Sequence, residues 1–136
     1  MSTERNEGRL DISDATRGFV DLMGATVVEA SADKVVLSLE VDERHHQPAG
    51  VLHGGVHCAL VETAVSIGAH LWDGGPVVGV SNHTDFIRSF RGGRLTTTGT
   101  PIHRGRSQQL WLAEIVDDNG KLIARGEVRL QNLNAL

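Results

Sequence analysis

The stretch VHCALVETAVSIGAHL, residues 56–71, has the strongest helical pattern in this chain. Its apolar side chains recur every three or four positions and fall within one stripe at about 100° per residue, which predicts an amphipathic helix with that stripe toward the core. The stripe consists of Val56, Leu60, Thr63, Ala64, Ile67 and Leu71. The Gly and Pro residues of DGGP, residues 73–76, are expected to end the helix.

Segments with the patterning of β-strands lie on both sides of this helix. Upstream, residues 25–30 and 34–41 predict a hairpin; downstream, strands are expected at 77–90, 94–103, 108–116 and 121–132. The Asn119–Gly120 pair marks a tight turn between the last two strands. Strand and helix do not alternate regularly, so the sequence predicts an α+β fold in which an antiparallel sheet packs on the long helix.

Less regular structure is expected in the N-terminal part of the chain. Apolar spacing up to Met23 indicates a short helix with Ser13 as its N-cap and Gly24 at its end. Residues 1–10 are polar and aperiodic and are expected to form a flexible arm, and residues 42–52 a loop. A chain of 136 residues then forms one domain, over residues 11–136.

Composition and charge exclude several classes of protein. The net charge of −4 disfavours broad attraction to nucleic acids or anionic membranes, so neither is expected as a partner. A single cysteine excludes an internal disulfide framework, and no signal peptide or membrane span is found, which predicts a cytoplasmic protein. His53 and His57 are four positions apart without a further ligand motif, so we expect no metal and no cofactor.

The residues that could carry chemistry lie at and within the predicted helix. Gly54 and Gly55 precede it, where free backbone N–H groups favour a developing negative charge; equally, the pair could only form a tight turn. Glu62 and Ser66 are four residues apart and share one side of the helix. A solvated carboxylate and a carboxylate poised for acyl transfer are both open readings of Glu62.

The neighbours of Glu62 favour coverage by a second subunit. Cys58, Val61, Val65 and Ala69 are not the residues of a solvated helix face, and a helix that is apolar nearly all round needs a partner on both sides. We therefore expect a homo-oligomer, either a dimer or a dimer of dimers, with equivalent sites at the interface.

The stretch HQPAGVLHGGVHCALVETAVSIGA, residues 46–69, resembles the hotdog-fold acyl-CoA thioesterases, in the branch that contains the 4-hydroxybenzoyl-CoA and phenylacetyl-CoA types. The resemblance continues through NHTDFIRSFRGGRLTTTGTPIHRGRSQQLW at 82–111 and EIVDDNGKLIARGEVRL at 114–130. It implies a hotdog fold, in which the sheet wraps around the long helix, and active sites at a dimer interface.

The resemblance also implies a role for each residue of a candidate site. Glu62 becomes the catalytic carboxylate, Gly54 the backbone donor to the thioester oxygen, and Gln47 and His53 polar groups that position the thioester or water. Ser66 would orient the hydrolytic water. Contacts with the CoA phosphates are implied for a basic set of residues: Arg88, Ser89, Arg104, Gly105 and Arg106.

The implied activity is hydrolysis of an aryl- or medium- to long-chain acyl-CoA to the free acid and CoA. Glu62 could act as a nucleophile or as a general base on water, and the sequence does not choose. Two alternatives remain open on the same fold: a non-catalytic acyl-CoA-binding or sensing domain, and a hydratase or dehydratase.

Overall fold

The computed structural model describes residues 13–136, and the arm predicted for residues 1–10 lies outside them. In chain order the elements are α1 (Phe19–Met23), β1 (Thr26–Ala30), β2 (Val35–Val41), the 3-10 turn η2 (Glu43–His45), α2 (Gly54–Asp73), β3 (Val77–Phe86), β4 (Gly93–Arg104), β5 (Gln108–Val116), β6 (Leu122–Asn132) and the 3-10 turn η3 (Leu133–Ala135).

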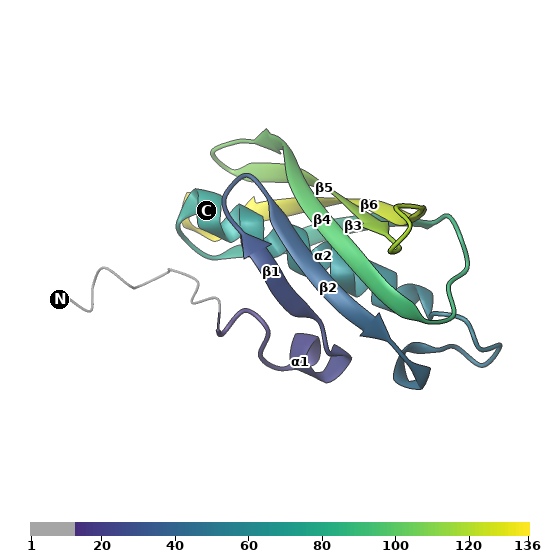
Figure 1. The fold of residues 1–136 in the computed structure, drawn as a ribbon. Helices are drawn as coiled ribbons and strands as arrows, with labels where there is room; N and C mark the ends of the chain where they lie inside the picture. Colours follow the sequence, from purple (N-terminus) through teal and green to yellow (C-terminus); the bar gives the residue numbers. More distant parts are fainter. Residues whose placement is uncertain (1–12) are drawn as a thin grey trace.

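The six strands form one sheet in the order β1-β2-β4-β5-β6-β3, and every neighbouring pair is antiparallel. The sheet curves around α2, which lies against one of its faces (Figure 1). This arrangement confirms the predicted α+β class and is the hotdog fold that the resemblance implied. The predicted tight turn is also present, since the Gly120 N–H donates to the Asp117 carbonyl at 3.0 Å.

The core lies between α2 and the concave face of the sheet. On the sheet side, Leu37, Leu95, Trp111 and Ile115 are fully buried. On α2 the buried side is rotated from the predicted stripe, because Val56, Thr63 and Leu71 are only partly buried. Leu60, Ala64 and Ile67 of that stripe are buried as predicted, and the other buried residues of the helix are His57, Val61, Val65, Gly68 and Ala69.

This rotation removes one of the reasons to expect a second subunit. Val61, Val65 and Ala69 do not need a partner to cover them, since all three have no exposed surface in the single chain. The inference that these three residues need a second subunit was wrong, because the chain's own fold already buries them.

The first helix is shorter than predicted. Residues 13–18 form turns, and α1 begins only at Phe19. The N-cap position is Gly18, whose φ of 77° interrupts any helix that would run on from Ser13. The predicted end at Gly24 is confirmed, since Gly24 adopts the left-handed conformation and its N–H donates to the Val20 carbonyl.

Strand β3 ends before the predicted residue 90. The backbone turns away after Phe86, where the N–H groups of Ile87 and Arg88 both donate to the Ile123 carbonyl. The predicted loop at 42–52 also contains the 3-10 turn η2 and one isolated bridge between His46 and Leu52. Within residues 13–136 no helix is long and apolar enough to cross a membrane.

Candidate active site

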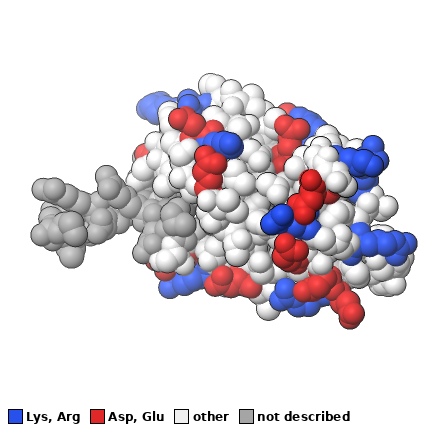
Figure 2. Space-filling view, in the orientation of Figure 1, with Lys and Arg blue, Asp and Glu red and all other residues white. Residues whose placement is uncertain are grey.

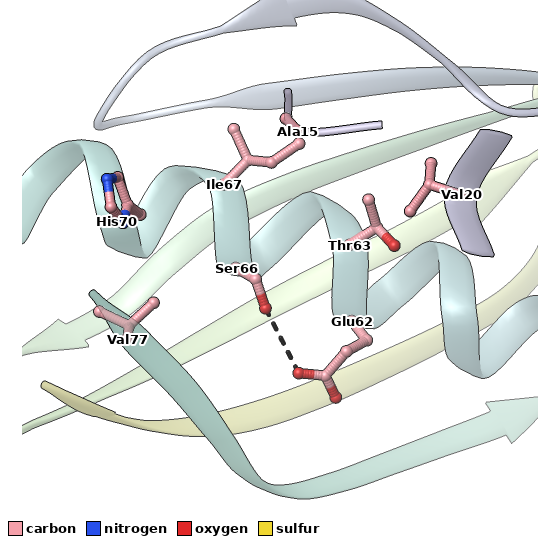
Figure 3. A pocket seen from close by; sticks show the side chains of 8 residues that line it. All are labelled: Ala15, Val20, Glu62, Thr63, Ser66, Ile67, His70 and Val77. Atoms are coloured by element: carbon pink, nitrogen blue, oxygen red, sulfur yellow. Dashed lines mark hydrogen bonds between the residues drawn. The ribbon is translucent and has the colours of Figure 1, made fainter. Parts of the chain in front are cut away.

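Glu62 projects from the middle of α2 toward β3 (Figure 3). Two side chains donate hydrogen bonds to its carboxylate: the Ser66 hydroxyl to Oε2 at 3.3 Å, and the Asn82 amide to Oε1 at 3.2 Å. Both contacts suit an ionised carboxylate, which can only accept hydrogen bonds. The structure therefore brings Glu62 and Ser66 together as predicted, with Ser66 bound directly to the carboxylate.

Asn82 is a site residue that the sequence reasoning missed. Its Nδ2 also donates to the Cys58 carbonyl at 3.1 Å, and its Oδ1 accepts the Thr84 hydroxyl at 2.6 Å. The Thr84 contact leaves the NH₂ group of Asn82 directed toward α2. An Asn and a Thr two positions apart on one strand were the available signal, but nothing in the sequence shows that this strand lies against Glu62.

A β-bulge in β3 allows the close approach to the carboxylate. The register with β6 shifts between Gly79 and Ser81. A Cβ built at Gly79 would lie 2.2 Å from Oε2 of Glu62, so any side chain there would displace the carboxylate. Glycine at position 79 is thus a requirement of the site.

A cavity of about 310 Å³ opens beside this carboxylate. Its walls come from the N-terminal segment, from α2 and from the first residue of β3: Ala15, Val20, Glu62, Thr63, Ser66, Ile67, His70 and Val77. Most of the lining surface is apolar, and the Glu62 carboxylate is the one acidic group among these eight residues. A carboxylate beside an apolar cavity is the arrangement expected of a site for a small organic ligand.

The N-terminus of α2 lies at Gly54. The N-cap is His53, whose Nδ1 accepts the Gly55 N–H at 2.8 Å. The Gly54 N–H has no hydrogen-bond acceptor among residues 13–136 and stays available as a donor. A Cβ at Gly54 would lie 2.3 Å from the Phe86 ring, so close packing, and not a left-handed turn, demands glycine there.

A second cavity, of about 240 Å³, lies at this end of the helix. It brings Gly54 together with two residues of the predicted CoA set, Arg88 and Ser89. His57 also lines it, with its ring 5.5 Å from that of Phe86 between centroids. Burial lowers the pKa of His57 to about 4, so this ring is neutral at pH 7.

Gln47 lies in the loop before α2. Its Oε1 accepts the Ala49 N–H and its backbone carbonyl accepts the Gly50 N–H, so its contacts shape the loop. In the described part of the chain its side chain makes no hydrogen bond to Glu62 or His53. The structure thus does not join Gln47 to the carboxylate within one chain.

The other half of the predicted CoA set lies between β4 and β5. Arg104 donates to Asp33 and to the Ala32 carbonyl, both at 2.8 Å, and lies over the Trp72 ring. The carbonyls of Gly105 and Arg106 accept hydrogen bonds from the Asn132 side chain, while the Arg106 side chain is exposed. This loop is separated from Arg88 by the length of β4, roughly 35 Å.

The surface holds no broad basic field on the face shown in Figure 2, where acidic and basic side chains are interspersed. Over residues 13–136, no three His, Cys, Asp or Glu side chains group together as a metal site requires. The groups that the two cavities bring together are a carboxylate, a hydroxyl, an amide and a backbone N–H donor.

Comparison with known proteins identifies the family. The family model described as "Thioesterase superfamily" matches residues 49–124, and the chain belongs to this superfamily of hotdog-type thioester hydrolases. Among its relatives, the Mycobacterium tuberculosis protein Rv1847 is 46% identical over 122 residues, covering 86% of this chain and 87% of that protein. The structure of Rv1847/MT1895 has a TM-score of 0.82 and covers 84% of this chain and 94% of its own.

Two further relatives carry names that describe an activity. A 1,4-dihydroxy-2-naphthoyl-CoA hydrolase of Listeria monocytogenes is 38% identical over 108 residues, covering 78% of this chain and 88% of that protein. The structure of thioesterase HI1161 from Haemophilus influenzae has a TM-score of 0.83 at 33% identity and covers 90% of this chain and 88% of its own.

Proposed function

We propose that this protein hydrolyses an acyl-CoA thioester to the free acid and CoA. The observation that carries the proposal is the Glu62 carboxylate at the wall of an apolar cavity, held by Ser66 and Asn82. Relatives named as CoA hydrolases support the same class of substrate.

The thioester carbonyl oxygen accepts the free N–H of Gly54, which stabilises the negative charge that develops there. Glu62 either attacks the carbonyl carbon, giving a mixed anhydride that water then opens, or removes a proton from water that attacks. In both routes the C–S bond breaks, the CoA sulfur leaves and gains a proton, and one water molecule is consumed.

These two groups cannot serve one thioester within a single chain. Gly54 and Glu62 are eight residues apart on α2, which is about 12 Å along the helix axis. A reacting carbonyl group needs both the donor and the carboxylate within about 3 Å of its atoms. The active site is therefore composed of Gly54 from one copy and Glu62 from a second copy.

Strand β3 offers the surface for this second copy. One edge of β3 pairs with β6, and no strand from residues 13–136 lies beside the other. Val78 and Val80 on this strand are 44% and 54% exposed, and Phe86 and Ile87 at its end are similarly exposed. An unpaired edge with exposed apolar side chains favours pairing with an identical edge across a two-fold axis.

A two-fold axis across β3 also makes the two α2 helices antiparallel. With the axis level with the point of α2 midway between Gly54 and Glu62, Gly54 of one copy faces Glu62 of the other. The same antiparallel arrangement directs the Arg88 end of one copy toward the Arg104 end of the other. Cations from two copies would then meet the phosphates of one CoA, as the predicted set requires.

A thiol-release assay over aryl, medium-chain and long-chain acyl-CoAs tests the activity. The wild type is expected to release CoA from at least one of them, and Glu62→Gln to release it at least about a hundredfold more slowly. Binding of acyl-CoA by the wild type without release would contradict the proposal and favour the binding or sensing domain.

A further inference from the structure

The cavity beside Glu62 extends along α2 beyond the carboxylate. Glu62, Ser66 and His70 lie at successive turns of the helix and all three line the cavity, while Ile67 and Val77 supply apolar walls (Figure 3). From Glu62 to His70 the helix advances about 12 Å. A ligand that has its reacting carbonyl at Glu62 can therefore extend along the helix toward His70.

The Nε2 atom of His70 is buried and has no hydrogen-bond partner within residues 13–136. Buried polar side-chain atoms are nearly always hydrogen-bonded, so an exception at the wall of a cavity needs an explanation. The other polar atoms of the cavity are already engaged: Ser66 and Glu62 bind each other, and the Thr63 hydroxyl donates to the Ala59 carbonyl.

We propose that His70 is a specificity-determining residue, whose Nε2 hydrogen-bonds a hydroxyl group at the end of the acyl group remote from the thioester. The inference rests on the proposed thioesterase function and deepens it. A hydroxyl group both donates and accepts a hydrogen bond, so it satisfies either neutral tautomer of the ring. An acyl group about as long as two fused rings would place its hydroxyl near His70.

The test uses two CoA thioesters that differ by one hydroxyl, 6-hydroxy-2-naphthoyl-CoA and 2-naphthoyl-CoA. The wild type is expected to show at least a tenfold higher kcat/KM on the hydroxylated thioester, because the analogue without the hydroxyl leaves Nε2 unpaired. His70→Phe, which keeps a ring without nitrogen, is expected to bring the ratio of the two kcat/KM values close to one. His70→Gln, which retains donor and acceptor atoms, should restore part of the preference.

Binding provides a readout that does not depend on turnover. In a Glu62→Gln background, calorimetry should give a lower Kd for the hydroxylated thioester, and His70→Phe should abolish that difference. Equal values for the two thioesters in the wild type, or an equal loss on both in His70→Phe, would overturn the role of His70. Failure of the thioesterase proposal would be seen separately, as no thiol release from any acyl-CoA. The binding comparison would still test the role of His70.

Discussion

The N-terminal end of α2 and its middle offer a ligand opposite kinds of group. At the N-terminal end, Gly54 presents a free N–H beside the Phe86 ring and the neutral His57. In the middle, Glu62 presents a carboxylate that accepts hydrogen bonds from Ser66 and Asn82. In the proposed reaction, the N-terminal region stabilises the negative charge on the thioester oxygen, and the middle region provides the nucleophile or base. Their separation along one helix explains why the proposed site needs two chains.

The largest effect is expected from the carboxylate region. Glu62→Gln keeps the size of the side chain but removes its ability to act as a base or nucleophile, so kcat for acyl-CoA should fall at least about a hundredfold. Circular dichroism and sedimentation should match the wild type. Activity within twofold of the wild type would exclude Glu62 from the chemistry.

A mixed dimer tests whether the two regions come from different chains. Gly54→Val places a side chain where the Phe86 ring lies and so disrupts the N–H donor region. Glu62→Gln removes the carboxylate. Each homodimer is expected to be inactive. A purified heterodimer with one chain of each kind, isolated through two affinity tags, regains one intact site of two. Its activity should reach about half that of the wild type. An inactive heterodimer would mean that each site is built within one chain.

Asn82→Leu is expected to lower kcat about tenfold with little change in KM. The leucine keeps a similar volume but cannot donate to Oε1, so the carboxylate loses one of the two groups that fix it. Thr84→Val should produce a smaller loss in the same direction, because the Asn82 amide then loses the hydroxyl bound to its Oδ1. Steady-state kinetics on one acyl-CoA measures the effect of both variants. A rise in KM without a fall in kcat would indicate that Asn82 acts in binding.

Arg88→Ala is expected to raise KM for acyl-CoA several-fold, most at low ionic strength, because salt screens an exposed ion pair. Arg106→Ala should do the same, since its side chain is exposed. A short thioester without the nucleotide is the control and should respond little. Arg104→Ala differs from both, because it also removes the bonds to Asp33 and Ala32 and should lower Tm.

His57 makes the N-terminal region of the site sensitive to acid. Burial lowers its pKa to about 4 in the folded chain, against about 6.5 when unfolded, so the unfolded state binds the extra proton between these values. The contribution of His57 to stability is complete above about pH 6.5 and is lost as the pH falls toward 4. Differential scanning fluorimetry should show Tm falling by a few degrees more between pH 7 and 5 in the wild type than in His57→Leu. Parallel curves would contradict this.

The elements and fold class could be predicted because they depend on local patterns. The hairpin at 26–41, the long helix and the turn at Asn119–Gly120 all have strong periodic or turn signals. The orientation of α2 could not be predicted, because this helix is apolar on more than one side. Only the packed sheet decides that Val61 and Val65 are fully buried while Val56 is only partly buried.

The candidate site was predictable only in the part that lies on one helix. Glu62 and Ser66 are four residues apart, and their contact follows from helix geometry. Asn82 reaches Glu62 from a strand twenty residues away, and such a contact depends on the bulge at Gly79 and on the pairing of β3 with β6. The distance between Arg88 and Arg104 likewise depends on β4 being one continuous strand.

The order of strands in the sheet also determines when each strand can pair with its neighbour during synthesis. Strand β3 leaves the ribosome before β4 and β5, yet it pairs with β6, the last strand to be made. Until Leu122–Asn132 has emerged, both edges of β3 are open and Asn82 has no paired backbone to hold it against α2. A nascent chain therefore carries Glu62 long before it carries the strand pairing that orders its surroundings, and loss of the C-terminal strand would leave an exposed apolar edge prone to wrong pairing.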